Sequence, residues 1–313
     1  MFRKFLKKPT AESDLPTESD LPAESDLLFK DATKDQLFDS IIKENGYVIL
    51  REAISSEKID YFRKYLQPHA SKYWHDIDMA VLDDEKLRSK LSLTHEIPDK
   101  GFFEVLLAQD AISESMFRHA HDYKNSYFDL ISFPAFWSLL YDAFPNCSFS
   151  VSNASHTRKM HPQVSISDFL EGNKHADGEE WGLPTEYHSD IFYHATTQLV
   201  LNIWIPFSNA GLKYKAPSLE IIKVGLERSQ SYLDYYVTDG VVKIEYEKYD
   251  PKNIHKEFDD KQRDFLNVKK GDIAIFSNWT IHRTHITPDM TSGRESLELR
   301  LVDQKEDFCK KYI

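Results

Sequence analysis

Apolar positions in the first part of the chain recur at the spacing of one helix face. The first such set is Leu37, Phe38, Ile41 and Ile42. Thr33 and Gln36 have the spacing of a capping box, and Gly46 can end the helix that begins there. We therefore predict a helix over about 34–45, followed by a short apolar strand over 47–50.

Helical patterns continue after this strand. Ser55 or Ser56 can cap a second helix, which should stop before Pro68. Further helical periodicity runs through roughly residues 82–144. The N-terminal part of the folded chain is therefore expected to be mainly helical.

From Cys147 onward the chain changes to short β-rich runs separated by Gly, Pro, Asn and Asp. The run 197–205 alternates most clearly between two faces, and Asn202 and Trp204 share one of them. Other strand candidates are residues 148–152, 218–224, 241–246, 272–276 and 296–302. This order predicts a mainly β fold in which N-terminal helices pack against an antiparallel core.

Residues 11–28 repeat an acidic hexapeptide three times, as AESDLP, TESDLP and AESDLL. Such a segment has almost nothing to pack, so we expect residues 1–28 to be a disordered acidic leader. A docking tether, with the basic residues 2–8 as a short interfacial helix, is the alternative. The remaining chain is long enough for one large domain. Its expected bounds are 29–313, with mainly helical support over 29–146 and the β core over 147–305.

The charge of the chain argues against one class of partner. There are 39 Lys and Arg residues against 51 Asp and Glu, and the net charge of -12 repels phosphate backbones, so nucleic acid is not expected. Cys147 and Cys309 are too few for a disulfide scaffold, which fits a reducing cytoplasm. The most apolar segment, 127–144, contains Asp129 and Asp142, so we expect a buried helix there and no transmembrane span.

Three His-x-acid motifs could contribute to a metal site. A histidine and a carboxylate two residues apart on a strand point the same way, and a distant second histidine can complete a set that leaves adjacent metal positions open. The candidates are His175-Ala-Asp177, His188-Ser-Asp190 and His255-Lys-Glu257. The first and third lie in polar stretches without a strand pattern, whereas the second leads into the alternating run. We therefore favour His188 and Asp190.

Two histidines could supply the third ligand. His282 and His285 follow the apolar strand 272–276 and lie three residues apart, so they cannot share one strand face. Arg294 and Arg300 come next and have equal strand parity. Either arginine could bind an anion or be a surface ion-pairing residue. The residues alone leave both choices open.

The ordered set of motifs resembles the phytanoyl-CoA dioxygenase family of iron(II)- and 2-oxoglutarate-dependent oxygenases, over roughly residues 35–302. The matching stretches are Asn45-Gly-Tyr-Val-Ile-Leu-Arg51, Tyr187-His-Ser-Asp190, Leu201-Asn-Ile-Trp-Ile-Pro206, Gly271-Asp-Ile-Ala-Ile-Phe276, His282-Arg-Thr284 and Gly293-Arg294. The family's Pro-Gly-Ser-His run is replaced by Lys223-Val-Gly-Leu226, near the substrate side. The resemblance implies a double-stranded β-helix (jelly-roll, cupin-like) core with N-terminal helices.

The resemblance also implies roles for single residues, and it favours His282 over His285 and Arg294 over Arg300. The implied iron(II) ligands are His188, Asp190 and His282. The implied contacts of 2-oxoglutarate are Arg294, Thr284 and Trp204, with Asn202 on the same strand face as Trp204.

The implied reaction is the oxidation of an unactivated C–H bond of a small-molecule substrate by O2, with release of succinate and CO2. Asp190 favours hydroxylation, because related halogenases carry Ala or Gly at this ligand position. His156 and Arg158 could bind an anionic substrate. The charged insertion 167–181 could close over the site as a lid or be a solvated loop.

Two other interpretations stay open. A metal-dependent hydrolase or isomerase on the same barrel would use the metal to activate water, but it gives Arg294 no role. A non-catalytic jelly-roll binding protein would have purely structural histidines. The sequence indicates neither the substrate nor the oligomeric state.

Overall fold

The structure is a computed structural model. It describes residues 26–65, 131, 133–151, 156–162, 184–193, 198–238 and 241–303. The expected leader over 1–25, the helical patterns over 82–130, the His175 motif and the segment 167–181 lie outside these residues. No helix in the described ranges combines the length and apolar character that crossing a membrane requires.

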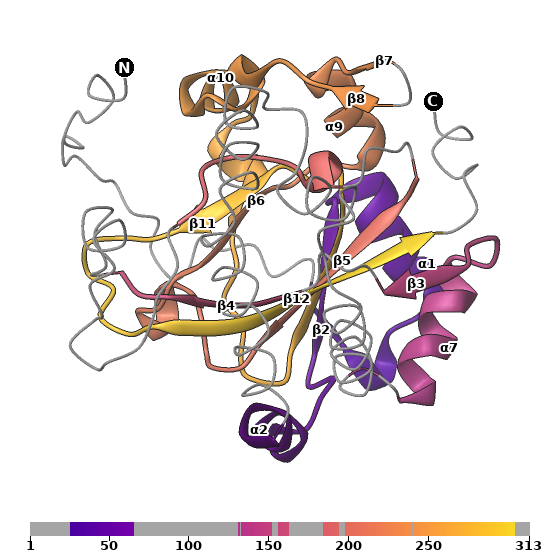
Figure 1. The fold of residues 1–313 in the computed structure, drawn as a ribbon, viewed down its shortest axis with the longest axis vertical. Coiled ribbons are helices and arrows are strands. Elements are labelled where there is room, and N and C mark those ends of the chain that lie inside the picture. Colours follow the sequence, from indigo (N-terminus) through magenta and orange to yellow (C-terminus); the bar gives the residue numbers. More distant parts are fainter. Residues whose placement is uncertain are drawn as a thin grey trace, which may run out of the picture.

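Seven strands form the larger sheet. They are β1 (Asp26–Leu28), β2 (Tyr47–Arg51), β3 (Phe149–Val151), β4 (His156–Met160), β5 (Val200–Pro206), β10 (Ile273–Ser277) and β12 (Arg294–Asp303). Their order is β1-β2-β10-β5-β12-β3, with β4 also paired to β12 (Figure 1). The pairs are antiparallel except for β1 with β2. Residues 26–28, expected in the leader, are therefore part of this sheet.

Three strands form a smaller sheet, in the order β11-β6-β9. They are β6 (Ser218–Ile222), β9 (Arg263–Phe265) and β11 (His282–His285). A hairpin of β7 (Tyr236–Thr238) and β8 (Val241–Lys243) stands apart from both sheets. The described part of the chain is thus rich in antiparallel sheet, as the sequence predicts.

The alternation of β5 explains how the sheets pack. Leu201 and Ile203 face the larger hydrophobic core, and Trp204 faces a second one. The second core takes residues from both sheets: Tyr47, Ile49, Trp204, Leu219, Ile221, Ala274 and Phe276. The two sheets therefore face each other, and every residue of β5 is buried.

The N-terminal helix forms in two parts. α1 (Lys34–Phe38) begins at the predicted capping box of Thr33 and Gln36, and a π-helix (Asp39–Glu44) continues it. Gly46 follows with φ +76°, and a β-carbon there would lie 2.5 Å from the Val224 carbonyl oxygen. Only glycine meets both conditions without strain.

The other N-terminal helices cover the larger core. α2 (Ser56–Tyr65) is capped at Ser55, whose Oγ accepts from Lys58 N at 3.2 Å. α7 (Pro134–Ala143) lies beside α1, and the rings of Phe38 and Phe144 are 5.5 Å apart (Figure 1). Both helices contribute side chains to the larger core, Ile59 from α2 and Phe136 and Leu140 from α7.

Two helices in the C-terminal half were not predicted. They are α9 (Leu226–Leu233) and α10 (Pro251–Glu257), which lie on one side of the molecule with the β7–β8 hairpin (Figure 1). The signal for α10 was present, because Asp250 caps the helix and Pro251 opens it. His255, one of the three candidate motif histidines, is exposed on α10 rather than in a loop.

Candidate metal site

His188, Asp190 and His282 come together between the two sheets. Their candidate ligand atoms, one from each side chain, lie within 4.8 Å of one another, so the three residues could hold a metal ion. His188 Nε2 and Asp190 Oδ1 are 3.6 Å apart. Within the described ranges this is the one such group of His, Cys, Asp or Glu side chains. Two imidazoles and one carboxylate are a donor set that suits iron(II) and leaves adjacent positions open.

Backbone pairing holds the two histidines side by side. His188 N donates to His282 O and His282 N donates to His188 O, both at 2.9 Å. His188 Nδ1 lies 2.7 Å from the carbonyl oxygen of Glu186, and His282 Nδ1 lies 2.9 Å from that of Thr280. A carbonyl oxygen can only accept, so each Nδ1 carries the proton and each Nε2 is left for a metal.

The environment of His188 also favours its neutral form. Removal from water lowers the pKa of His188 to about 4, and the neighbouring His282 acts in the same direction. Metal binding requires a neutral imidazole. At neutral pH, His188 can therefore bind a metal without first losing a proton.

Asp190 does not lie on a strand, contrary to the expectation for the His-x-Asp motif. The chain leaves the bridge at His188 and enters a 3-10 helix (Asp190–Tyr193), whose tight turn brings the carboxylate beside the imidazole. Arg300 Nη2 donates to Asp190 Oδ2 at 3.2 Å. No described residue donates a hydrogen bond to Oδ1, which is left available to a metal.

The same arginine keeps Asp190 charged. Burial raises the pKa of this carboxyl group, but the positive charge of Arg300, with smaller effects from the two histidine side chains, outweighs burial, and the pKa is lowered. Asp190 is only 2% exposed, so its charge depends on these partners. It therefore enters the site as a carboxylate.

A small cavity, with a volume of about 20 Å³, opens beside the three residues. Its apolar wall includes Trp204, Leu219 and Phe276, and its polar wall includes Asn202, Arg158 and Glu298. Side chains of both sheets contribute, as expected for a site between them.

Arg294 begins β12 and is fully buried. Its side chain is 0% exposed, and none of its three nitrogen atoms has a hydrogen-bond acceptor among the described residues. The guanidinium carbon lies 5.2 Å from the ring centroid of Trp204, which lines the cavity. Burial lowers the pKa of Arg294 to about 9. A buried cation without an anion is costly, so the arrangement indicates a place for an anionic ligand.

Other polar atoms on the same face also lack partners. Arg294 and Ser296 share a strand face, and the register places that face beside Asn202 and Trp204 of β5. Ser296 Oγ, Trp204 Nε1 and both amide atoms of Asn202 are buried without a hydrogen bond to any described residue. Buried polar groups are normally hydrogen-bonded, so these unpartnered atoms are consistent with a polar molecule that binds along this face.

The structure separates the two histidines that the residues alone left equivalent. β11 places His282 and Thr284 on its inner face, and Thr284 Oγ1 accepts from Thr185 N at 3.1 Å. His285 lies on the outer face, where its ring is 4.4 Å from that of Phe265. Only His282 of this pair is brought to Asp190.

The pairing of Arg300 with Asp190 was not predicted. Strand parity showed that Arg294 and Arg300 share a face, but not which of them meets an acid. The structure gives them different surroundings, because Arg300 donates to Asp190 and Arg294 contacts Trp204. Arg158, expected near the substrate, lies 3.8 Å from Glu298 at the cavity wall.

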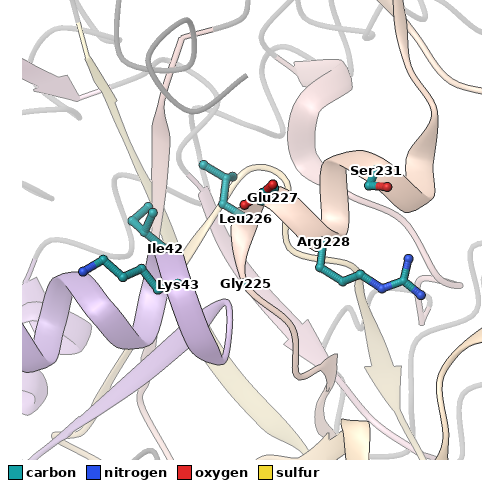
Figure 2. A pocket seen from close by; sticks show the side chains of 7 residues that line it. All are labelled: Ile42, Lys43, Gly225, Leu226, Glu227, Arg228 and Ser231. Carbon is teal, nitrogen blue, oxygen red and sulfur yellow. The ribbon is translucent and has the colours of Figure 1, made fainter.

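A second hollow, with a volume of about 400 Å³, lies at the start of α9 (Figure 2). Lys43 and Arg228 point away from each other there, and each has an acidic partner, Asp39 at 2.7 Å and Glu257 respectively. Gly225 approaches the Lys43 carbonyl so closely that a β-carbon would clash. The described wall of the hollow therefore offers no unpaired cation. The hollow is larger than the cavity beside His188 but contains no group of metal-binding side chains among the described residues.

No family model and no curated protein matches the sequence. Among solved structures, the non-heme alpha ketoglutarate dependent carbocyclase SnoK from nogalamycin biosynthesis is 13% identical, with 92% of this chain and 93% of that chain covered and a TM-score of 0.48.

AviO1 from Streptomyces viridochromogenes Tue57 is 12% identical, with 87% and 96% covered and a TM-score of 0.43. The epimerase SnoN, in complex with Fe3+, alpha ketoglutarate and nogalamycin RO, is 12% identical, with 86% and 83% covered and a TM-score of 0.44. These likenesses are too low to assign the chain to a family, so its function has to be argued from the site.

Proposed function

We propose that this chain is an iron(II)- and 2-oxoglutarate-dependent dioxygenase that hydroxylates an unactivated C–H bond of a small-molecule substrate. The observation that carries the proposal is Arg294, a fully buried cation without a hydrogen-bond acceptor among the described residues, which lies against Trp204 on the strand face that leads to the metal-ligand group. The proposed core is a double-stranded β-helix similar to that of the phytanoyl-CoA dioxygenase family.

The proposed metal ligands are His188 Nε2, Asp190 Oδ1 and His282 Nε2. Two neutral imidazoles and one carboxylate leave an iron(II) ion with a net positive charge and with adjacent open positions. Arg300 holds Asp190 Oδ2 and so turns Oδ1 toward His188. The orientation of the carboxylate is thus set before any metal binds.

The proposed contacts of 2-oxoglutarate are Arg294, Trp204, Asn202 and Thr284. The planar guanidinium of Arg294 can make two charge-assisted hydrogen bonds to the carboxylate remote from the metal. Trp204 Nε1 and the Asn202 amide are buried donors without partners in the described chain, and both lie on the cavity wall. Thr284 lies on the inner face of β11, where its hydroxyl accepts a hydrogen bond from Thr185 N.

When bound, iron(II) and 2-oxoglutarate would together supply the oxidation of the substrate by O2, with release of succinate and CO2. The chain's own part is to orient the ligands and to exclude water. Trp204, Leu219 and Phe276 form an apolar wall of the cavity beside the metal-ligand group, and a substrate bound against this wall would exclude water from it. The carboxylate of Asp190 occupies the ligand position that a halide would need, which favours hydroxylation.

Anaerobic titration tests this proposal. Iron(II) and then 2-oxoglutarate are added to the purified chain, and the weak visible charge-transfer band of metal-chelated 2-oxoglutarate is followed. We expect the band in the wild type and in His285→Gln, and its loss in His282→Ala, because only His282 reaches Asp190. Succinate release would then serve to screen substrates.

The same titration can refute the proposal. If folded wild-type protein that has taken up iron shows no band, 2-oxoglutarate is not its co-substrate, and a metal-dependent hydrolase or isomerase becomes the better account. If His282→Ala keeps the band while His285→Gln loses it, the ligand assignment is wrong.

A further inference from the structure

A row of polar side chains lies on the opposite face of β11 and β6 from the metal-ligand histidines. His282 pairs with Ile221 across β11 and β6, so the next pair is Arg283 with Glu220. The bridge of His188 with His282 likewise places Tyr187 opposite Arg283. Because strand neighbours point to opposite faces, this row occupies the outer face and the ligands the inner face.

Glu220 is the centre of the outer row. It is 0% exposed and accepts hydrogen bonds from Tyr187 Oη at 2.6 Å, Arg263 Nε at 2.8 Å and Arg283 Nε at 2.6 Å. The guanidinium of Arg283 lies 4.3 Å from the ring centroid of Tyr187. One buried carboxylate therefore contacts the residue before His188 and the residue after His282.

The charge state of Glu220 is consistent with this role. Burial raises the pKa of the carboxyl group, but Arg283, the hydrogen bond from Tyr187 and Arg263 outweigh burial, and the pKa is lowered. Glu220 is therefore a carboxylate in the fold. Charge-assisted hydrogen bonds to a buried carboxylate are strong and directional, so they restrict the side chains that make them.

The segment that carries His188 is also held at Ser189, whose Oγ lies 2.5 Å from Tyr249 Oη, but Tyr187 Oη gives it its hydrogen bond to β6. It forms an isolated bridge rather than a strand, and Thr185 is tied to Thr284 at its other end. Without the contact of Tyr187 to Glu220, the backbone on the N-terminal side of His188 would lose its attachment to β6. The angle of the imidazole relative to His282 would then be less well fixed.

We propose that Glu220 is a positioning residue for the metal centre, which fixes the segments of His188 and His282 relative to each other through Tyr187 and Arg283. This inference rests on the proposed function, because it assigns the two histidines to a metal. Residues that orient metal ligands from behind typically contribute about 10- to 100-fold to metal affinity. Glu220 acts through the backbone neighbours of the ligands rather than by touching them.

Cobalt(II) alone serves as the probe. It is titrated into the full chain without 2-oxoglutarate, and its visible absorption reports both affinity and coordination. We expect Glu220→Gln to weaken cobalt(II) binding by about tenfold or more and to change the band shape. Tyr187→Phe keeps the ring under Arg283 and removes only the hydroxyl, so it should give a smaller loss in the same direction.

Asp272→Asn is the matched control. Asp272 is 2% exposed and pairs with Arg51 at 2.6 Å, so its substitution also leaves an arginine without a buried carboxylate, but next to no ligand-bearing segment. We expect Asp272→Asn to lower the thermal unfolding midpoint about as much as Glu220→Gln while cobalt(II) affinity stays within about twofold of the wild type.

Three outcomes would overturn the inference. Folded Glu220→Gln could bind cobalt(II) as the wild type does, or Asp272→Asn could lose affinity by the same factor, which would make the effect one of general stability. If Glu220→Gln does not fold, unchanged affinity in Tyr187→Phe decides against the role. A wild type that binds no cobalt(II) or iron(II) refutes the proposed function itself, which separates that failure from the others.

Discussion

Replacing Arg294 with methionine should stabilise the metal-free protein and weaken 2-oxoglutarate binding at the same time. Methionine has a similar length but carries no charge. Arg294 is 0% exposed and has no hydrogen-bond acceptor among the described residues, and its guanidinium lies 5.2 Å from the ring centroid of Trp204. The substitution therefore removes a buried charge that forms no ion pair with any described residue.

The magnitude follows from the pKa of the side chain. Burial lowers the pKa of Arg294 well below its ordinary value, to about 9, which corresponds to roughly 5 kcal/mol against the charged form in the fold. At pH 7.5 the arginine is charged in both folded and unfolded states, so the whole penalty acts. The penalty would be relieved only as the pH rises above about 9, where the folded protein loses this proton before the unfolded chain does.

Local rearrangement reduces the gain that can be measured. Replacing buried charged groups by apolar residues of similar volume often changes the free energy of unfolding by roughly 1–4 kcal/mol in the stabilising direction. We expect Arg294→Met to fall in this range without metal. For 2-oxoglutarate the sign is reversed, because losing a desolvated charged partner costs roughly 2–5 kcal/mol, or at least about 30-fold in affinity.

The assay combines two measurements. Chemical denaturation of the metal-free proteins at pH 7.5 gives the free energies of unfolding, and anaerobic titration of the iron-loaded proteins gives the affinity for 2-oxoglutarate. Arg51→Met is the control, since Arg51 is paired with Asp26 and Asp272, each at 2.6 Å. It should lose stability and keep its affinity for 2-oxoglutarate.

Either of two results would refute the reasoning. If metal-free Arg294→Met is less stable than the wild type, the guanidinium has a partner that stabilises it. If its affinity for 2-oxoglutarate stays within about threefold of the wild type, Arg294 does not bind the co-substrate.

Two further predictions concern charges around the site. Arg300→Gln leaves Asp190 buried without its cation, so the free energy of unfolding of the metal-free protein should fall by roughly 3–5 kcal/mol. Excess cobalt(II) should restore part of this stability, which thermal denaturation would measure. A metal-free variant as stable as the wild type would show that the ion pair contributes little. His285 is kept neutral because burial lowers its pKa to about 4, so the wild type should lose roughly 2–3 kcal/mol as the pH falls from 6.5 to 4, where only the unfolded chain takes up this proton. His285→Gln should lose less over the same range in denaturation experiments at stepped pH, and parallel profiles for the two proteins would assign the acid sensitivity to other groups.

The sequence by itself determined the local elements. The capping box of Thr33 and Gln36, the end of the helix near Gly46 and the alternation of Asn202 and Trp204 all depend on residues a few positions apart, and each has its predicted form. The order of His188-x-Asp190, His282 and Arg294 also identified a candidate site that the fold brings to the space between the sheets. These features can be predicted from the sequence because helix and strand periodicity depend on residues that are close together in the chain.

The tertiary structure decided which polar groups meet. Glu220 accepts from Tyr187, Arg263 and Arg283, which lie 33, 43 and 63 residues away, and Arg300 reaches Asp190 across 110 residues. No pattern along the chain encodes such pairs, because they depend on strand register and on which face each strand presents. Burial then sets their energies, since the same arginine is inexpensive in water and costly without an anion in the core. For that reason Arg294 and Arg300, equivalent in strand parity, have different surroundings only in the folded protein.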